Sequence, residues 1–192
     1  MAKSTSILED EETTAYQLTS ECKRFIAASP FLLIASASRT RGADISPRGD
    51  MPGFVQTDGA NTLLLPDRIG NNRVDTMSNL FENPRVGLVF FIPSDESVLA
   101  IQGDAQISTD PDLLQRFAVK AKPPKTVMKI VVTCAVKQTA RSLAASGFWS
   151  SGHSSGPPSF PTLGDILADQ VGGVSKDDAN EFVNQSYKQR LY

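Results

Sequence analysis

Three arginines occur in short segments that favour turns. Arg48 follows a proline within residues 46–50, and Arg68 and Arg73 both lie within residues 65–75. A guanidinium group can bind two phosphate oxygens at once, which makes arginine a common partner of phosphate groups. The three arginines are therefore candidates for an anion site.

A helix that we expect to begin at Asn71 or Asn72 bears on the role of Arg73. Asparagine is a favoured N-cap, and the free N–H groups of a first helical turn attract anions. A cation in that turn is unfavourable for the helix alone. It becomes favourable when a phosphate group lies between the guanidinium and the helix end.

Surface salt bridges are a simpler interpretation of the same residues. Aspartates follow or adjoin the arginines in sequence, at Asp50, Asp67 and Asp75. Exposed ion pairs contribute little to stability, and spacing alone does not choose between the two interpretations. The chain has neither G-x-G-x-x-G nor G-x-x-x-x-G-K-[ST], so a nucleotide would have to be held without either glycine-rich loop.

Composition favours one globular domain without structural metal or disulfides. The 192 residues are 40% hydrophobic and 21% charged, which is ordinary for a chain able to bury a sizeable core. The net charge of −2 lacks the positive excess that nonspecific nucleic-acid binding needs. Two cysteines and one histidine cannot complete a four-ligand zinc site without carboxylates. We expect no metal and no nucleic-acid partner.

The sequence also gives no sign of a membrane or secretory segment. No apolar stretch approaches the ~20 residues of a spanning helix, and the acidic N-terminus does not resemble a signal peptide. We therefore expect a cytoplasmic protein with no membrane partner. Cys134 lies in a valine-rich stretch and His153 in a Ser/Gly-rich loop, so we interpret them as a buried inert thiol and a loop residue.

Apolar periodicity predicts about six strands interrupted by short helices. The expected strands cover 31–37, a segment ending near 46, 63–65, 86–92, 98–108 and 126–136, and the hairpin signal Asp58-Gly59 follows residues 54–57. The expected helices cover 18–28, 71–83 and 110–122, the second with Val74, Met77, Leu80 and Phe81 on one face. Because regular βαβ alternation is absent, we expect a mainly β protein, a small antiparallel barrel with flanking helices.

Composition divides the chain into four parts. We expect a mobile acidic tail at 1–14, the barrel domain at 15–149, a Ser/Gly/Pro-rich loop at 150–161 and a helical appendage at 162–192. The two helices expected in the appendage are too short to form a second core. They should pack on the barrel or on a partner subunit.

Around the arginines the sequence resembles the pyridoxamine 5′-phosphate oxidase superfamily of FMN-binding split barrels, and most of all its branch of FMN-dependent enzymes. The matching segments are 44–50, 52–55, 65–68, 70–73 and 83–88, with weaker matches at 103–105 and at Cys134, Lys137, Arg141 and Ser142. The resemblance covers roughly residues 20–150. It implies a six-stranded split barrel and a homodimer with FMN at the subunit interface.

The resemblance also implies roles for particular residues. Arg48 and Arg73 would contact the FMN phosphate, and Asn72 would supply a neutral contact. The other cofactor-binding candidates are Ser46, Arg68 and Asn71, together with Leu65 and Pro66, where the strand backbone would run beside the flavin ring. Arg141 and Trp149 are candidates for the substrate side. No catalytic residue is predicted, because the flavin supplies the electron chemistry.

The expected function is that of a flavin-dependent oxidoreductase. Vitamin B6 phosphates are not expected substrates, because the basic, His-containing C-terminal motif of the true oxidase is missing; only His153 and the terminal residues 189–192 stand in its place. Ala100 also replaces an arginine that is usual in the branch. Two alternatives remain open: a non-catalytic flavin-binding protein for storage or sensing, and the same barrel with a deazaflavin or haem.

Overall fold

The protein folds around one seven-stranded antiparallel sheet with the strand order β2-β1-β5-β6-β7-β4-β3. The computed structural model describes residues 18–68, 75–150 and 160–190, so the expected acidic tail at 1–14 lies outside the described residues. The strands are β1 Phe31–Ser38, β2 Gly42–Gly49, β3 Gln56–Asp58, β4 Thr62–Asp67, β5 Arg85–Phe91, β6 Ser97–Ser108 and β7 Thr126–Thr139. The helices are α1 Ser20–Ala28, α2 Asp75–Glu82, α3 Pro111–Arg116, α4 Arg141–Ser146, α5 Leu163–Val171 and α6 Lys176–Arg190.

The expected mainly β fold is confirmed, but the count of six strands is wrong. The additional strand is the three-residue β3, which pairs only with β4 across the Asp58-Gly59 hairpin. Gly59 has a φ of +65°, the left-handed conformation that this turn requires. A pairing of three residues is too short for the apolar alternation by which longer strands are recognised.

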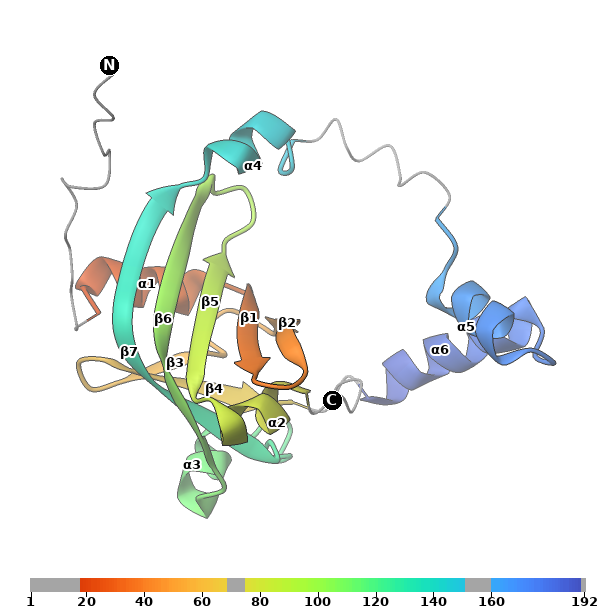
Figure 1. The fold of residues 1–192 in the computed structure, drawn as a ribbon, viewed down its shortest axis with the longest axis horizontal. Coiled ribbons are helices and arrows are strands. Elements are labelled where there is room, and N and C mark those ends of the chain that lie inside the picture. The colour runs from red at the N-terminus through yellow and green to blue at the C-terminus, as the bar shows by residue number, and fades with distance from the viewer. Residues whose placement is uncertain (1–17, 69–74, 151–159, 191–192) are drawn as a thin grey trace.

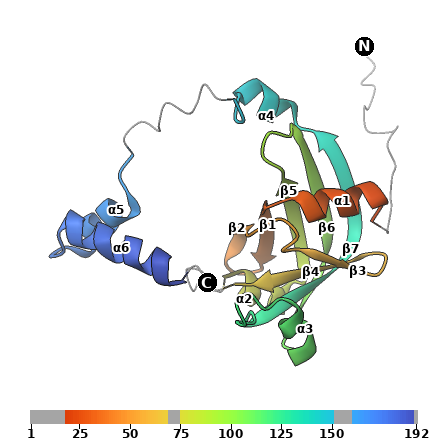
Figure 2. The ribbon, with the colours of Figure 1, turned by 180° about the vertical axis from the view of Figure 1, so that it is seen from behind.

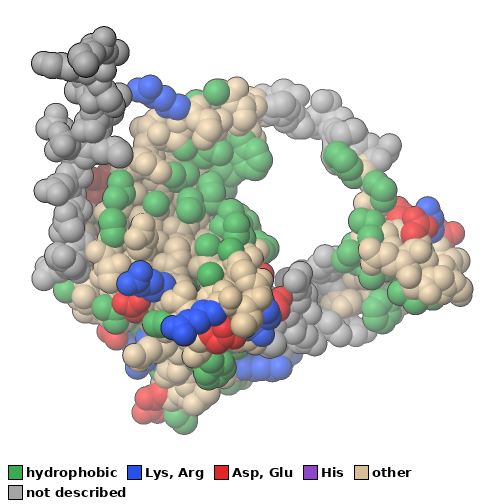
Figure 3. All heavy atoms as spheres, viewed as in Figure 1, with side chains coloured by type: hydrophobic (Ala, Val, Ile, Leu, Met, Phe, Trp, Pro, Cys, Tyr) green, Lys and Arg blue, Asp and Glu red, His purple; other side chains and the backbone are tan. Residues whose placement is uncertain are grey.

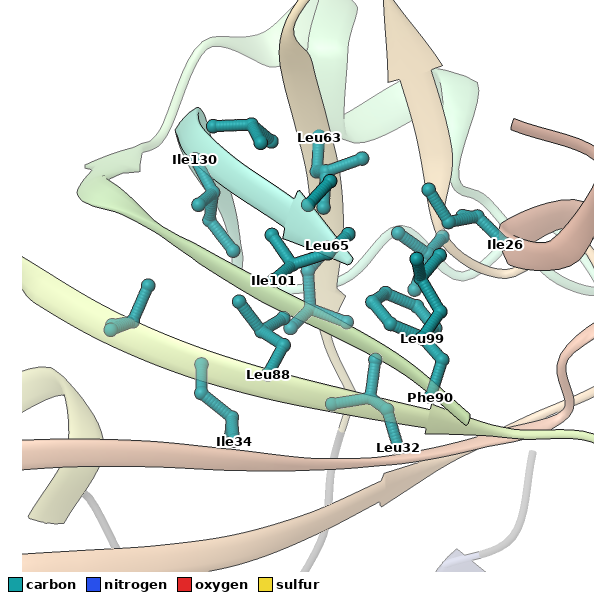
Figure 4. Close-up of a cluster of buried hydrophobic side chains, with 14 of the residues drawn as sticks. Ile26, Leu32, Ile34, Leu63, Leu65, Leu88, Phe90, Leu99, Ile101 and Ile130 are labelled. Carbon is teal, nitrogen blue, oxygen red and sulfur yellow. The ribbon is translucent and has the colours of Figure 1, made fainter. Parts of the chain in front are cut away.

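The sheet curls around an apolar core (Figure 1). Alternate residues of the strands point inward, as expected for a period of two. Figure 4 shows Leu32, Leu65, Leu88 and Ile101 converging from four strands, with Ile26 of α1 approaching from one side. Seen from behind, α1 and the β3–β4 hairpin lie across the side away from β5 and β6 (Figure 2).

A β-bulge between Gln102 and Gly103 bends the longest pair of strands, β6 and β7. A Cβ atom at position 103 would lie 2.5 Å from the carbonyl oxygen of Val131. Only glycine allows the two backbones to approach so closely here. Because a bulge locally strengthens twist and bend, it helps the sheet to close.

The closure stops short of a complete ring. β2 pairs only with β1, and β3 pairs only with residues 62–64 of β4, whereas β7 pairs with β4 through Asp67. The backbone edge of β4 at residues 65–67 therefore has no strand beside it among the described residues. We call the opening between β2 and this edge of β4 the split.

Several helices differ in detail from their expected form. In α2, Phe81 is 85% exposed, whereas Thr76 and Asn79 are buried. The expected apolar face of this helix is thus wrong at Phe81, because hydrogen bonds from Thr76 to Asp44 and from Asn79 to Ser36 orient the helix instead. α3 begins as expected at Pro111 after its Asp110 cap, but ends at Arg116.

Three helices follow the last strand. The six-residue α4 was not expected, whereas α5 and α6 occur where apolar spacing predicts helices. The expected loop at 150–161 falls largely on residues outside the described part. None of the described helices combines the length and apolar composition needed to cross a bilayer.

Candidate functional site

The split collects several of the polar residues that the sequence singled out. Asp44, Ser46 and Arg48 alternate along β2, so their side chains share one face of this edge strand. That face is turned toward α2, because the side chains of Asp44 and Ser46 both contact Thr76 in the helix's first turn. Strand alternation therefore places Ser46 and Arg48 on the α2 side of β2.

Hydroxyl groups surround the carboxylate of Asp44. The Ser46 hydroxyl donates to Asp44 Oδ2 at 2.9 Å, and Thr76 Oγ1 lies 3.3 Å from the same oxygen and 3.4 Å from Ser46 Oγ. Thr76 is only 2% exposed. These bonds fix the start of α2 against β2.

Arg48 has an incompletely paired guanidinium. Its Nη1 donates to the backbone oxygen of Pro47 at 3.1 Å. Its Nε is buried and has no hydrogen-bond partner within the described residues. A buried donor without an acceptor is costly in free energy, and a charged one marks a place where an anion would be stabilised.

Asp67, at the end of β4, interacts electrostatically with Arg48 across the split. Burial raises the pKa of its carboxyl group, while the positive charges of Arg48 and Lys125 act in the opposite direction. Burial is the larger effect.

Arg68 is held differently from Arg48. Its Nε donates to Asp50 Oδ2 at 3.1 Å, and its Nη1 donates to the backbone oxygen of Phe117 at 2.6 Å. The Arg68 and Asp50 side chains are 18% and 10% exposed. This ion pair joins the end of β2 to the end of β4, and so it fixes the width of the split.

The remaining predicted cofactor contacts are partly placed. Leu65 is fully buried in the barrel core, and Pro66 is buried on the opposite face of β4. Their backbone forms the open edge of β4, which is the position expected beside a flavin ring. Asn71, Asn72 and Arg73 lie outside the described residues, so their predicted phosphate contacts stay predictions.

The two residues expected on the substrate side lie elsewhere in this chain. Arg141 is the exposed first residue of α4, and α4 and α2 lie at opposite ends of the sheet (Figures 1 and 2). Trp149 is half-buried, with its ring 4.8 Å from that of Phe148 and its buried Nε1 unpaired. A single chain does not bring Arg141 to the split.

The donor set at the split fits the phosphate end of a flavin nucleotide. Among the described residues it offers the buried Nε of Arg48, while the hydroxyl groups of Ser46 and Thr76 donate to Asp44. Asp44 and Asp67 carry the opposing charges. Among the residues that the structure describes, no group of three His, Cys, Asp or Glu side chains could hold a metal ion.

Comparison with known families decides the membership of the chain. Residues 18–137 match the model of the pyridoxamine 5′-phosphate oxidase family. The chain belongs to this family. Membership supports a flavin-binding, oxidoreductase-type function at the level of the family, and no curated protein matches the chain.

Solved structures share the fold at low sequence identity. HupZ of Group A Streptococcus aligns with a TM-score of 0.52 and 16% identity, over 64% of this chain and 94% of its own. A Lactobacillus delbrueckii protein described as a "putative pyridoxamine 5′-phosphate oxidase" aligns with a TM-score of 0.50 and 15% identity, over 65% of this chain and 97% of its own. These similarities support the split-barrel fold.

Sequence reasoning missed Asp44 and Thr76, and gave Asp67 only a salt-bridge role. The alternation of Asp44, Ser46 and Arg48 along one strand was a usable signal, since three polar residues at a period of two share a face. Thr76 carries no such signal, because a buried threonine in a helix is recognised only from the partner it meets in the fold.

Proposed function

We propose that the protein is a cytoplasmic, homodimeric FMN-binding oxidoreductase whose FMN phosphate binds in the split. The observation that carries this proposal is the buried Nε of Arg48, which has no partner among the described residues, beside the half-buried carboxylate of Asp67. An anionic oxygen at this position would satisfy the donor and balance the charge. In the proposal, Arg73, Asn71 and Asn72 complete the phosphate contacts from the start of α2.

Each described residue of the split has a distinct task in this proposal. Arg48 binds the phosphate, and the hydrogen bonds of Ser46 and Thr76 to Asp44 hold the start of α2 against β2. The open backbone edge at Leu65 and Pro66 lies along the flavin ring. The ion pair between Arg68 and Asp50 keeps β2 and β4 apart at a fixed distance, in addition to any contact of Arg68 with the cofactor. Bound FMN would supply the redox chemistry.

The outer face of the sheet supports the homodimer. Phe31 is 40% exposed there and stacks on Phe91 at 6.1 Å, and Val131 and Val136 are 47% and 36% exposed. Figure 3 shows hydrophobic side chains gathered over the upper part of β5 to β7. Apolar surface of this extent is typical of a face that a partner covers. A second subunit would also bring another Arg141 and Trp149 toward the split.

We propose that the substrate is not a vitamin B6 phosphate. The chain has only His153 and the terminal residues 189–192 in place of the basic, His-containing C-terminal motif that would hold such a substrate.

Stripping the protein of small molecules and titrating it with FMN tests the proposal. We expect a shifted flavin absorption spectrum, quenched or altered fluorescence, and reduction of the bound flavin by an added hydride donor such as NADPH or NADH. Binding without reduction by either nicotinamide donor, while dithionite still reduces the bound flavin, would favour a storage or sensing protein. Failure to bind FMN would contradict the proposal.

A further inference from the structure

The helices α5 and α6 form a C-terminal hairpin with a small and largely polar interior. Its buried residues are Gly164, Ala168 and Ala179. Asn180 fills the space beside Gly164 and donates to Asp165 Oδ1 at 3.0 Å. Small side chains and polar contacts bury little apolar area, so the hairpin does not form a core of its own.

The bulky apolar side chains of the hairpin and its flanks point outward instead. Phe160 and Phe182 are 74% and 68% exposed. Four further apolar side chains are also exposed: Leu163, Ile166, Val171 and Val174. Among the described elements, α5 and α6 make extensive contacts only with each other. Figures 1 and 3 show the hairpin clear of its own barrel. So much exposed apolar surface indicates a docking surface.

A complementary hollow lies on the outer face of the barrel sheet. It has a volume of about 640 Å³. Small residues form its floor, and they are Ala35, Ala37, Ala43 and Gly87. Polar residues surround them, including Asn83, Arg85, Gln102 and Thr133. A floor of alanine and glycine leaves room for large side chains from another surface. The hollow lies on the opposite face of β2 from Ser46 and Arg48, because Ala43 and Ser46 alternate along the strand.

Charge adds to this complementarity of shape. Exposed carboxylates occur on the hairpin at Asp169, Asp177, Asp178 and Glu181, and its cations are Lys176, which pairs with Asp169, and Lys188 and Arg190 near the end of α6. Arg85 and Asp104 line the hollow, and Arg39 and Arg41 lie in the turn between Ala37 and Ala43, where Arg41 pairs with Glu82. Arginines outnumber carboxylates at this rim by one, so the excess of carboxylates on the hairpin favours the contact modestly.

We propose that the C-terminal hairpin of one subunit packs into the outer-face hollow of a second copy. The twelve residues 151–162 between the turn at 147–150 and α5 can span up to about 40 Å, which is enough to reach a neighbouring barrel. Two such contacts related by a two-fold axis would give a closed dimer in which each hairpin covers its partner's sheet. This inference rests on the homodimer of the proposed function and names the segment that makes it.

Disulfide trapping between differently tagged chains tests the exchange. In a Cys134→Ser background, one chain carries Phe182→Cys and the other carries Gln102→Cys, both at exposed positions. Co-expression followed by mild oxidation should give a heterodimer that carries both tags and disappears on reduction. Phe81→Cys, which is 85% exposed on α2, replaces Phe182→Cys as the matched control. No heterodimer, or equal yields with the control, would overturn the proposal.

A second variant tests the energetic contribution of the hairpin. Leu163→Asp with Ile166→Asp should raise the dimer Kd at least about a hundredfold, which corresponds to about 2.8 kcal/mol, while the barrel's melting transition is retained. An unchanged dimer Kd would contradict the proposal. FMN titration of the unmodified protein separates the two claims: trapped heterodimers without FMN binding would refute the proposed function alone, and FMN binding without trapping would refute the hairpin exchange alone.

Discussion

Replacing Arg48 with alanine should weaken FMN binding far more than riboflavin binding. Arg48 has a buried Nε that finds no partner in the described part of the chain, and in our account an FMN phosphate oxygen accepts that hydrogen bond. Loss of one partner from a charge-assisted contact costs about 2–5 kcal/mol. Arg48 is half-buried, so we take the low end, about 2 kcal/mol. This corresponds to a loss of affinity of roughly 30-fold. Riboflavin lacks the phosphate and should lose little.

Arg68→Ala is the matched control, because Arg68 is an arginine of the same split with different partners. Its removal deprives the nearly buried Asp50 of its ion pair and the Phe117 carbonyl of a donor. Breaking such a pair costs about 3–5 kcal/mol of stability when it is buried. We therefore expect Arg68→Ala to lower the free energy of unfolding markedly, whereas Arg48→Ala leaves it nearly unchanged or raises it.

The assay combines fluorescence titration with each flavin and urea unfolding of the stripped protein. Arg48→Lys should recover part of the FMN affinity, because it keeps the charge and loses the guanidinium's paired donors. Equal losses for FMN and riboflavin in Arg48→Ala would refute the phosphate contact. If Arg68→Ala instead lost FMN affinity selectively, by the amount expected for Arg48→Ala and with no loss of stability, the two arginines would have the opposite roles.

Three further outcomes are expected. Asp67→Asn should tighten FMN binding several-fold without affecting riboflavin, because it removes a negative charge from the split. Burial raises the pKa of Asp67 above its ordinary value of 3.8. The unmodified protein should therefore lose stability relative to this variant as the pH rises from below 3.8 through the raised pKa, which urea unfolding at several pH values would reveal. Sedimentation equilibrium should give a mass of two 20.7 kDa chains across a wide concentration range, and a monomer that still binds FMN would contradict an interfacial site. Pyridoxamine 5′-phosphate should be turned over far more slowly than the ~10 per second typical of enzymes, as monitored by formation of the aldehyde product.

Strand alternation and turn signals made most of the barrel predictable. Leu32, Leu88 and Ile101 face the core as a period of two requires, and Asp58-Gly59 forms the expected hairpin. Helix orientation was less predictable, since hydrogen bonds of Thr76 and Asn79 outweigh the apolar pattern and leave Phe81 exposed.

The candidate site was predictable in its residue types but not in their pairing. Arg48 and Arg68 look equivalent in sequence, each with aspartates nearby. The fold distinguishes them, because Arg68 reaches both Asp50 and the Phe117 carbonyl across 18 and 49 positions of the chain. Such long-range pairs depend on how β2 and β4 end on the two sides of the split, which no local pattern specifies.

Identification of the chromophore released from the purified protein tests the central claim most directly. The protein should be yellow, and heat denaturation should release a non-covalent compound with the mass and spectrum of FMN, one per chain. FAD, a deazaflavin or a haem in its place, or no bound chromophore even after incubation with FMN, would contradict the account.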